Sequence, residues 1–156
     1  MEKLIRAAGR RGKQTAALKH HGHGGTKPAP LPGNHKDSSR HKTAGAFVSA
    51  VEGNGAFQME AETGLSLPQI LTIYQSFNPD VIFIEGYKQA DYPKVVLLRT
   101  TEDQSLLREC SNILCVISSV PFEGGWDFPS FSMEDEQDYL DFLLKKMGVD
   151  YDHESI

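Results

Sequence analysis

Three unbroken apolar runs constrain the fold of this chain more than any other feature of its sequence. They occupy residues 81–84, 95–98 and 113–117. Strands that are apolar at every position, rather than at every second position, are typical of parallel sheets that helices cover on both faces. The runs therefore predict an α/β protein, a three-layer sandwich around a mostly parallel sheet.

The segments around these runs carry the periodicity expected of helices and of one further strand. Pro68 opens a segment with helical spacing, and Asn78 and Pro79 end it directly before an apolar run. A helix that leads into a buried strand is typical of a βαβ unit. A further strand is predicted at residues 15–18. Helices are predicted from residue 1 to Gly9 or Gly12 and from Ser38 or Ser39 to Gly45. Three more helices are predicted at residues 68–77, 102–108 and 134–147.

One segment departs from the parallel pattern. Asn54 and Gly55 separate two strand-like runs at residues 46–51 and 56–60. Asn-Gly is a strong signal for the two-residue turn of a β-hairpin, because both turn positions take positive φ. An antiparallel hairpin is therefore predicted alongside the parallel sheet.

Length, charge and cysteine content limit the class of protein. A chain of 156 residues suits one domain, which we expect to span residues 1–156. A formal net charge of −5 gives no general attraction for a polyanion, so no nucleic-acid partner is expected. No window approaches the roughly 18 apolar residues of a membrane span. Two cysteines do not suit a disulfide-rich secreted protein. We therefore expect a cytoplasmic protein.

Polar residues follow two of the predicted strands, at the place where open α/β sheets bind ligands. Glu85 follows the run at residues 81–84, and a carboxylate there can hold Mg²⁺ directly or through water. Gly86 lets its backbone N–H approach a phosphate. The alternative for Glu85 is a strand-end acid that is hydrogen-bonded to a neighbouring loop.

Two further motifs carry polar side chains. Asp37, Arg40 and His41 surround the start of a short predicted helix, where they either clamp an anion or form a solvated cap with a surface arginine. The cluster His20, His21 and His23 is interpreted as a glycine-flexed loop for a phosphate or a partner, with structural zinc and an inert polar loop as alternatives.

These motifs, taken in order, resemble the MobB family of adaptor proteins in molybdopterin-guanine dinucleotide biosynthesis. The resemblance rests on four segments: Lys19-His20-His21-Gly22-His23-Gly24, the DSxRHxxAGA pattern over residues 37–46, Glu85-Gly86-Tyr87-Lys88, and Pro93-Lys94. In motif terms it covers residues 1 to about 99, and the remainder matches in layout alone.

The resemblance implies a P-loop GTPase-like fold, binding of GTP with Mg²⁺, and at most a weak GTPase activity. It also implies a homodimer and a partnership with a MobA-type guanylyltransferase, which attaches GMP to molybdopterin. Glu85 is then the Mg²⁺-side acid and Gly86 the γ-phosphate contact. Asp37, Arg40 and His41 lie around the phosphates or the partner's substrate, while Lys88 and Lys94 add positive charge for a pyrophosphate.

The sequence departs from the family at its start. Family members have a strand and a P-loop ending in GKTT directly before the helix that Met1–Ile5 resembles, whereas this sequence shows neither. Gly9–Thr15 contains Gly-Lys but lacks the P-loop spacing. The P-loop lysine and backbone N–H groups cradle the β- and γ-phosphates. We therefore expect weak or no GTP binding by this chain, and unpaired strands beside the missing one.

Two functions of other classes remain as alternatives. One is a non-catalytic adaptor that keeps the surface for its partner and needs no nucleotide. The other is a metal-binding protein that uses the histidine loop. Partner binding without nucleotide distinguishes the first, and stoichiometric zinc distinguishes the second.

Overall fold

The computed structural model describes residues 1–21, 36–62, 64–122 and 124–149. The chain divides into two compact units, residues 1–23 with 78–156, and residues 24–77. Each unit is described by itself, and the expectation of one domain over the whole chain stays a prediction. No helix in the described ranges is both long and apolar enough to cross a membrane.

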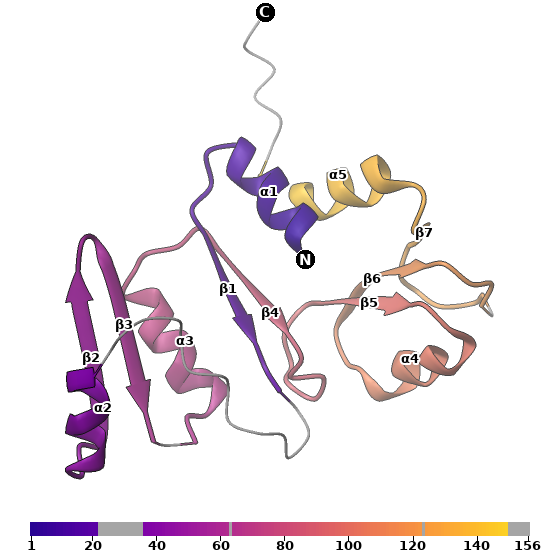
Figure 1. Ribbon diagram of the computed structural model, residues 1–156. Coiled ribbons are helices and arrows are strands. Elements are labelled where there is room, and N and C mark those ends of the chain that lie inside the picture. Colours follow the sequence, from indigo (N-terminus) through magenta and orange to yellow (C-terminus); the bar gives the residue numbers. More distant parts are fainter. Residues whose placement is uncertain (22–35, 63, 123, 150–156) are drawn as a thin grey trace, which may run out of the picture. The chain divides into compact units, whose positions relative to one another are not determined.

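The larger unit holds two parallel sheets (Figure 1). In the first, β1 (Thr15–Lys19) pairs with β4 (Val81–Glu85). In the second, β6 (Ile113–Ser118) lies between β5 (Lys94–Leu98) and β7 (Ser130–Ser132) and is parallel to both. The three apolar runs are thus strands, as predicted, and β7 is an addition that its short, mixed sequence did not reveal.

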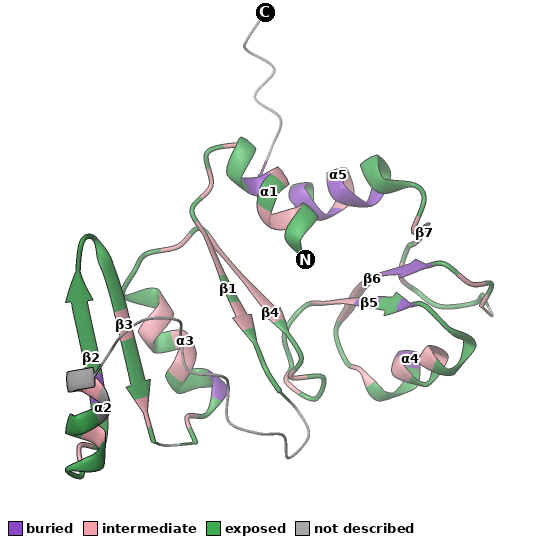
Figure 2. Ribbon diagram, viewed as in Figure 1, coloured by how far each residue is buried: buried purple, intermediate pink, exposed green. Residues whose placement is uncertain are grey.

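Helices cover one face of the second sheet in a compact layer. α1 (Glu2–Arg10) and α5 (Glu136–Lys146) pack together, and their apolar side chains share a core with Cys115 and Ile117 of β6. Burial raises the pKa of the Cys115 thiol to about 11, since an apolar environment disfavours the thiolate. The apolar stripe of the predicted C-terminal helix is therefore core packing (Figure 2).

The other face of this sheet is covered by a shorter helical segment. The 3-10 helix η1 (Thr101–Ser105) continues directly into α4 (Leu106–Glu109), where the sequence predicted one helix. Leu107 packs against Val116 of β6 in a second apolar cluster. Because β6 alternates its side chains between two helical layers, this part of the unit has the predicted three-layer arrangement.

The smaller unit contains the antiparallel hairpin. β2 (Val48–Gly53) and β3 (Ala56–Ala61) pair around Asn54 and Gly55, which have φ values of 51° and 75°. Positive φ at both positions is what a type I′ hairpin turn requires. The prediction of an antiparallel hairpin is confirmed, although its first strand begins two residues later than expected.

Two helices accompany the hairpin in this unit. α3 (Leu67–Gln75) follows Ser66, which forms a reciprocal capping box with Gln69, and Pro68 lies in its first turn as predicted. α2 (Lys36–Thr43) packs on β2, and Ser49 Oγ donates a hydrogen bond to the Ser38 carbonyl at 3.1 Å. The prediction of a cap at Ser38 or Ser39 was wrong, because α2 begins at residue 36 and includes both serines.

The interpretation of β4 as a buried strand was also wrong, and its partner β1 is no better covered. Their side chains are half-buried or exposed, although Val81–Ile84 are all apolar. Within the described residues each of these strands has only the other as a neighbour. A two-stranded sheet leaves one edge of each strand uncovered, so an apolar run alone does not ensure burial.

The two neighbouring leucines of β5 allow a test of the core. Leu98 is fully buried, whereas the side chain of Leu97 is 37% exposed. Leu98→Ala is expected to lower the free energy of unfolding by about 2–5 kcal/mol, because it leaves a cavity. Leu97→Ala should cost about 0.5 kcal/mol. Urea unfolding of both variants measures the difference, and equal losses would contradict this account of the core.

Candidate functional site

The carboxyl ends of β1 and β4 bring two predicted motifs together. The two strands are parallel and in register, so Lys19 lies opposite Glu85 at their last positions. Lys19 Nζ is 3.3 Å from Glu85 Oε1, and both side chains are more than half exposed. An ion pair at this exposure contributes about 0–1 kcal/mol to stability. The carboxylate is thus accessible and has a cation beside it.

Gly86 makes a close approach that no other residue type fits. The His20 N–H donates a hydrogen bond to the Glu85 carbonyl at 2.8 Å, one step beyond the β1–β4 ladder. Gly86 has a φ of 94°, and a Cβ atom placed on it would lie 2.9 Å from His20 Cβ and 3.1 Å from the His20 carbonyl oxygen. Residue 86 must therefore be glycine both for its backbone conformation and for the space beside it.

The next residue, Tyr87, completes the turn after β4. Its φ is 50°, in the left-handed region, and its ring stacks on that of His20 with centroids 4.0 Å apart and planes 26° apart. Lys88 follows as an exposed side chain. The ends of β1 and β4 thus bring together an imidazole, a carboxylate, a phenol ring and the Lys19 ammonium, and Lys88 follows next in the chain.

Lys94 was predicted to add positive charge for the pyrophosphate of a substrate or nucleotide, and it makes structural contacts. Its ammonium donates to the carbonyl oxygens of Tyr92 and Ser111, each at 3.0 Å, and also to that of Ala90. Lys94 therefore ties the loop before β5 to the loop before β6. A further role at a ligand stays a prediction.

The remaining predicted residues lie elsewhere or outside the described part. Arg40 and His41 are exposed residues of α2, in the smaller unit. The backbone of Asp37 belongs to the same helix. His21 follows His20 and is exposed, whereas His23 lies outside the described residues. The structure therefore brings together His20, Glu85, Gly86 and Lys88, and their relation to the α2 residues stays a prediction.

The described residues contain no group of three or more histidine, cysteine, aspartate or glutamate side chains that could hold a metal ion. A magnesium site of the kind found with nucleotides needs fewer protein ligands, since Mg²⁺ is commonly held by one or two carboxylates, several waters and the phosphates of the substrate. The exposed Glu85 carboxylate fits that limited requirement.

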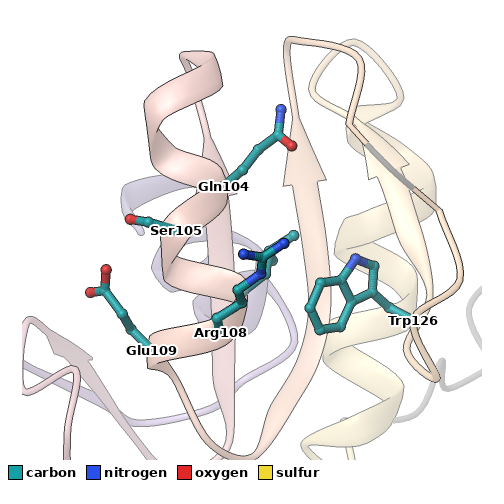
Figure 3. A pocket seen from close by; sticks show the side chains of 6 residues that line it. Gln104, Ser105, Arg108, Glu109 and Trp126 are labelled. Carbon is teal, nitrogen blue, oxygen red and sulfur yellow. The ribbon is translucent and has the colours of Figure 1, made fainter.

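A shallow cavity of about 410 Å³ lies away from these residues, beside η1 and α4. Arg108 and Trp126 are among its lining residues, and the Arg108 side chain points toward the indole ring (Figure 3). Trp126 also stacks on Phe128, with ring centroids 5.6 Å apart. No sequence motif predicted this cavity, although the chain's one tryptophan, after two glycines, marks the place.

The contact at Gly86 predicts an unusually costly alanine substitution. Gly12 also has a positive φ, 73°, but a Cβ atom there would meet nothing within 4 Å. Both substitutions strain the backbone, and Gly86→Ala must also displace His20. We expect Gly86→Ala to lower the free energy of unfolding by about 1–3 kcal/mol more than Gly12→Ala does. Thermal or urea unfolding measures both, and equal losses would show that His20 moves away freely.

Comparisons with known proteins agree with the resemblance seen in the motifs. The family model described as MobB, molybdopterin guanine dinucleotide synthesis protein B, matches residues 1–119. A curated Bacillus subtilis protein, described as a "probable molybdopterin-guanine dinucleotide biosynthesis adapter protein", is 41% identical over 117 residues. That match covers 75% of this chain and 66% of the relative, so the chain spans somewhat less than two thirds of the relative's length.

Solved structures extend the agreement to the fold. The crystal structure of Bacillus subtilis MobB is 33% identical, with a TM-score of 0.77 over 93% of this chain and 86% of that one. A MobB homologue from Bacillus stearothermophilus is also 33% identical, with a TM-score of 0.75 over 96% of this chain and 88% of that one. The sequence, the fold and the motifs at the ends of β1 and β4 together place the chain in the MobB family.

Proposed function

We propose that this chain is a GTP-binding adaptor in molybdenum cofactor biosynthesis. It assists the conversion of molybdopterin to molybdopterin guanine dinucleotide by a MobA-type guanylyltransferase, and it works in the cytoplasm. The family match over residues 1–119 carries this proposal, because that range includes every residue predicted to take part in the site. The name of the curated relative, a biosynthesis adapter protein, supports the same role.

The nucleotide would bind at the carboxyl ends of β1 and β4. Mg²⁺ supplies positive charge that neutralises phosphate oxygens when it is bound with a nucleotide. Glu85 would hold it directly or through water, and the backbone N–H of Gly86 would approach the terminal phosphate. Lys19 lies 3.3 Å from the Glu85 carboxylate, and with Lys88 it places two cations where phosphate charge would gather.

The residues of α2 would contribute from the smaller unit. Arg40 and His41 are exposed on one short helix with basic residues in its last turn. A guanidinium with its planar set of donors is well suited to a phosphate. Asp37 would complete this group around the phosphates or the partner's substrate.

Contact with the guanylyltransferase and its pterin substrate would involve the loop after β1. His20 and His21 are exposed, and His23 continues the same motif. Together with Lys94 they would face the partner, molybdopterin or its guanine dinucleotide. A nucleotide-independent adaptor and a zinc-binding histidine loop are the competing functions.

We also propose that the chain is a homodimer, joined through the hairpin. α2 packs on the β2 side that carries Ser49. The alternating register places Val48, Phe57 and Met59 on the opposite face, and each of these apolar side chains is more than 40% exposed. An apolar face of this kind on a hairpin is typical of an interaction surface, and a second copy would cover it.

Aspartate substitutions test the hairpin as a dimer contact. Phe57→Asp would bury a charge in the interface, so we expect the mass measured by sedimentation to fall from a dimer to a monomer. Phe77→Asp is the matched control, since Phe77 is at least as exposed as Phe57 (64% against 54%) but lies outside the hairpin. A monomeric parent chain, or dissociation by both substitutions, would contradict the proposed contact.

Calorimetry tests the nucleotide site. GTP and ATP are titrated with Mg²⁺ into this chain and into a version extended upstream by a family-type strand and P-loop. We expect GTP to bind the extended version and to bind this chain weakly or not at all, because P-loop N–H groups and lysine carry much of the phosphate affinity. Binding by neither would overturn the GTP proposal and favour the nucleotide-independent adaptor.

In the extended version, Glu85→Ala is expected to weaken Mg²⁺-dependent GTP binding by about tenfold, since the metal loses its protein carboxylate. Removal of Mg²⁺ with a chelator should abolish the difference from the parent. Glu109→Ala, which removes an exposed carboxylate on α4, is the control and should leave the dissociation constant unchanged. An unchanged dissociation constant for Glu85→Ala would remove the metal role.

A further inference from the structure

Tyr87 occupies a backbone conformation that its residue type disfavours. Four non-glycine residues in the described ranges have a positive φ, and the other three are Asn54, Asn78 and Asn112. Asparagine tolerates the left-handed region because its short polar side chain forms local hydrogen bonds, whereas a bulky aromatic residue has no such compensation. The side chain of Tyr87 must therefore gain something at this position that asparagine would not.

The gain is the contact with His20. The two rings stack with centroids 4.0 Å apart and planes 26° apart, within the range of favourable aromatic pairs. His20 is itself fixed by the hydrogen bond from its N–H to the Glu85 carbonyl. The stack thus links the residue that follows β1 to the second residue after β4.

The stack also closes over Gly86. Because His20 Cβ and the His20 carbonyl oxygen occupy the space where a side chain of residue 86 would lie, the turn after β4 is held from one side by His20 and from the next position by the Tyr87 ring. Glu85 lies directly before this turn and Lys88 directly after it. The contacts of His20 and Tyr87 therefore fall on the segment that joins Glu85 to Lys88.

We propose that Tyr87 is a positioning residue, whose stack on His20 holds the Gly86–Lys88 backbone across the ends of β1 and β4 for an oxyanion ligand. The ligand class, a nucleoside triphosphate with Mg²⁺, rests on the function proposed above. The positioning of the backbone does not, because the contacts that carry it are present without a ligand.

Two substitutions at Tyr87 separate positioning from backbone strain. Tyr87→Phe keeps the ring and the strained φ. Tyr87→Asn removes the ring but supplies the residue type that the chain uses at its other left-handed positions. If Tyr87 served stability alone, relief of strain would offset part of the lost contact. If it positions the turn, Tyr87→Asn should loosen residues 86–88 while the melting temperature changes little.

Nuclear magnetic resonance of the intact chain measures the loosening directly. We expect the heteronuclear ¹⁵N NOE of the Gly86 and Lys88 amides to fall clearly in Tyr87→Asn and to stay at the parent value in Tyr87→Phe. In the version extended by a strand and P-loop, Tyr87→Asn should raise the dissociation constant for GTP with Mg²⁺ about tenfold. Tyr87→Phe should raise it less than twofold. An unchanged ¹⁵N NOE of the Gly86 and Lys88 amides in Tyr87→Asn would overturn the proposal. So would an equal fall of the NOE in both variants.

His20, on which Tyr87 stacks, supplies a second test of the proposal should Tyr87→Asn fail to fold. His20→Ala removes the same stack from the other ring, and His20→Phe restores a ring; we expect loosening of the Gly86 amide in the first and recovery in the second. Failure of the parent to bind GTP would contradict the proposed function alone, since the amide measurements would still decide the role of the stack. An unchanged ¹⁵N NOE of the Gly86 amide in His20→Ala would show that the stack does not hold this turn.

Discussion

Burial of β6 on both faces is the constraint on which the larger unit depends. Its side chains alternate between the α1–α5 layer, which receives Cys115 and Ile117, and the α4 layer, which receives Val116. β5 and β7 then pair with its two edges. A shift of one residue would exchange the side chains of the two faces, so the fit of these side chains to the two helical layers fixes the register. The positions of the loops at its ends follow from that register.

The sequence predicted those elements best whose burial depends on their own residues. The run at 113–117 and the stripe on α5 became core because each is apolar enough to require cover. The same signal misled at Val81–Ile84, where burial depends on neighbouring strands that a single run cannot specify. Boundaries at α2 were missed for a similar reason: serines favour caps, yet Ser49 gives the Ser38 carbonyl a tertiary partner inside the helix.

The candidate site shows the same division. The positions of Glu85 and Gly86 at the end of β4 were predictable, because the apolar run ends directly before them; their roles at a ligand stay predictions. The role of Tyr87 was not predictable, since neither its positive φ nor its stack on His20 can be inferred from the residues next to it in the sequence. Lys94 was predicted to add positive charge for a pyrophosphate, but three carbonyl oxygens from two loops surround its ammonium. Groups that act through distant contacts are visible only in the folded chain.

The packing of α1 against α5 has a consequence for how the protein is made. These helices are joined by ion pairs from Lys3 to Glu136 and from Arg11 to Asp141, and by a shared apolar core. More than a hundred residues separate the partners in each pair, and the whole smaller unit lies between them in the sequence. During synthesis the apolar face of α1 therefore stays only partly covered until α5 has left the ribosome. The hairpin unit can form earlier from local contacts, so α1 docks fully only after elements that are synthesised later than itself.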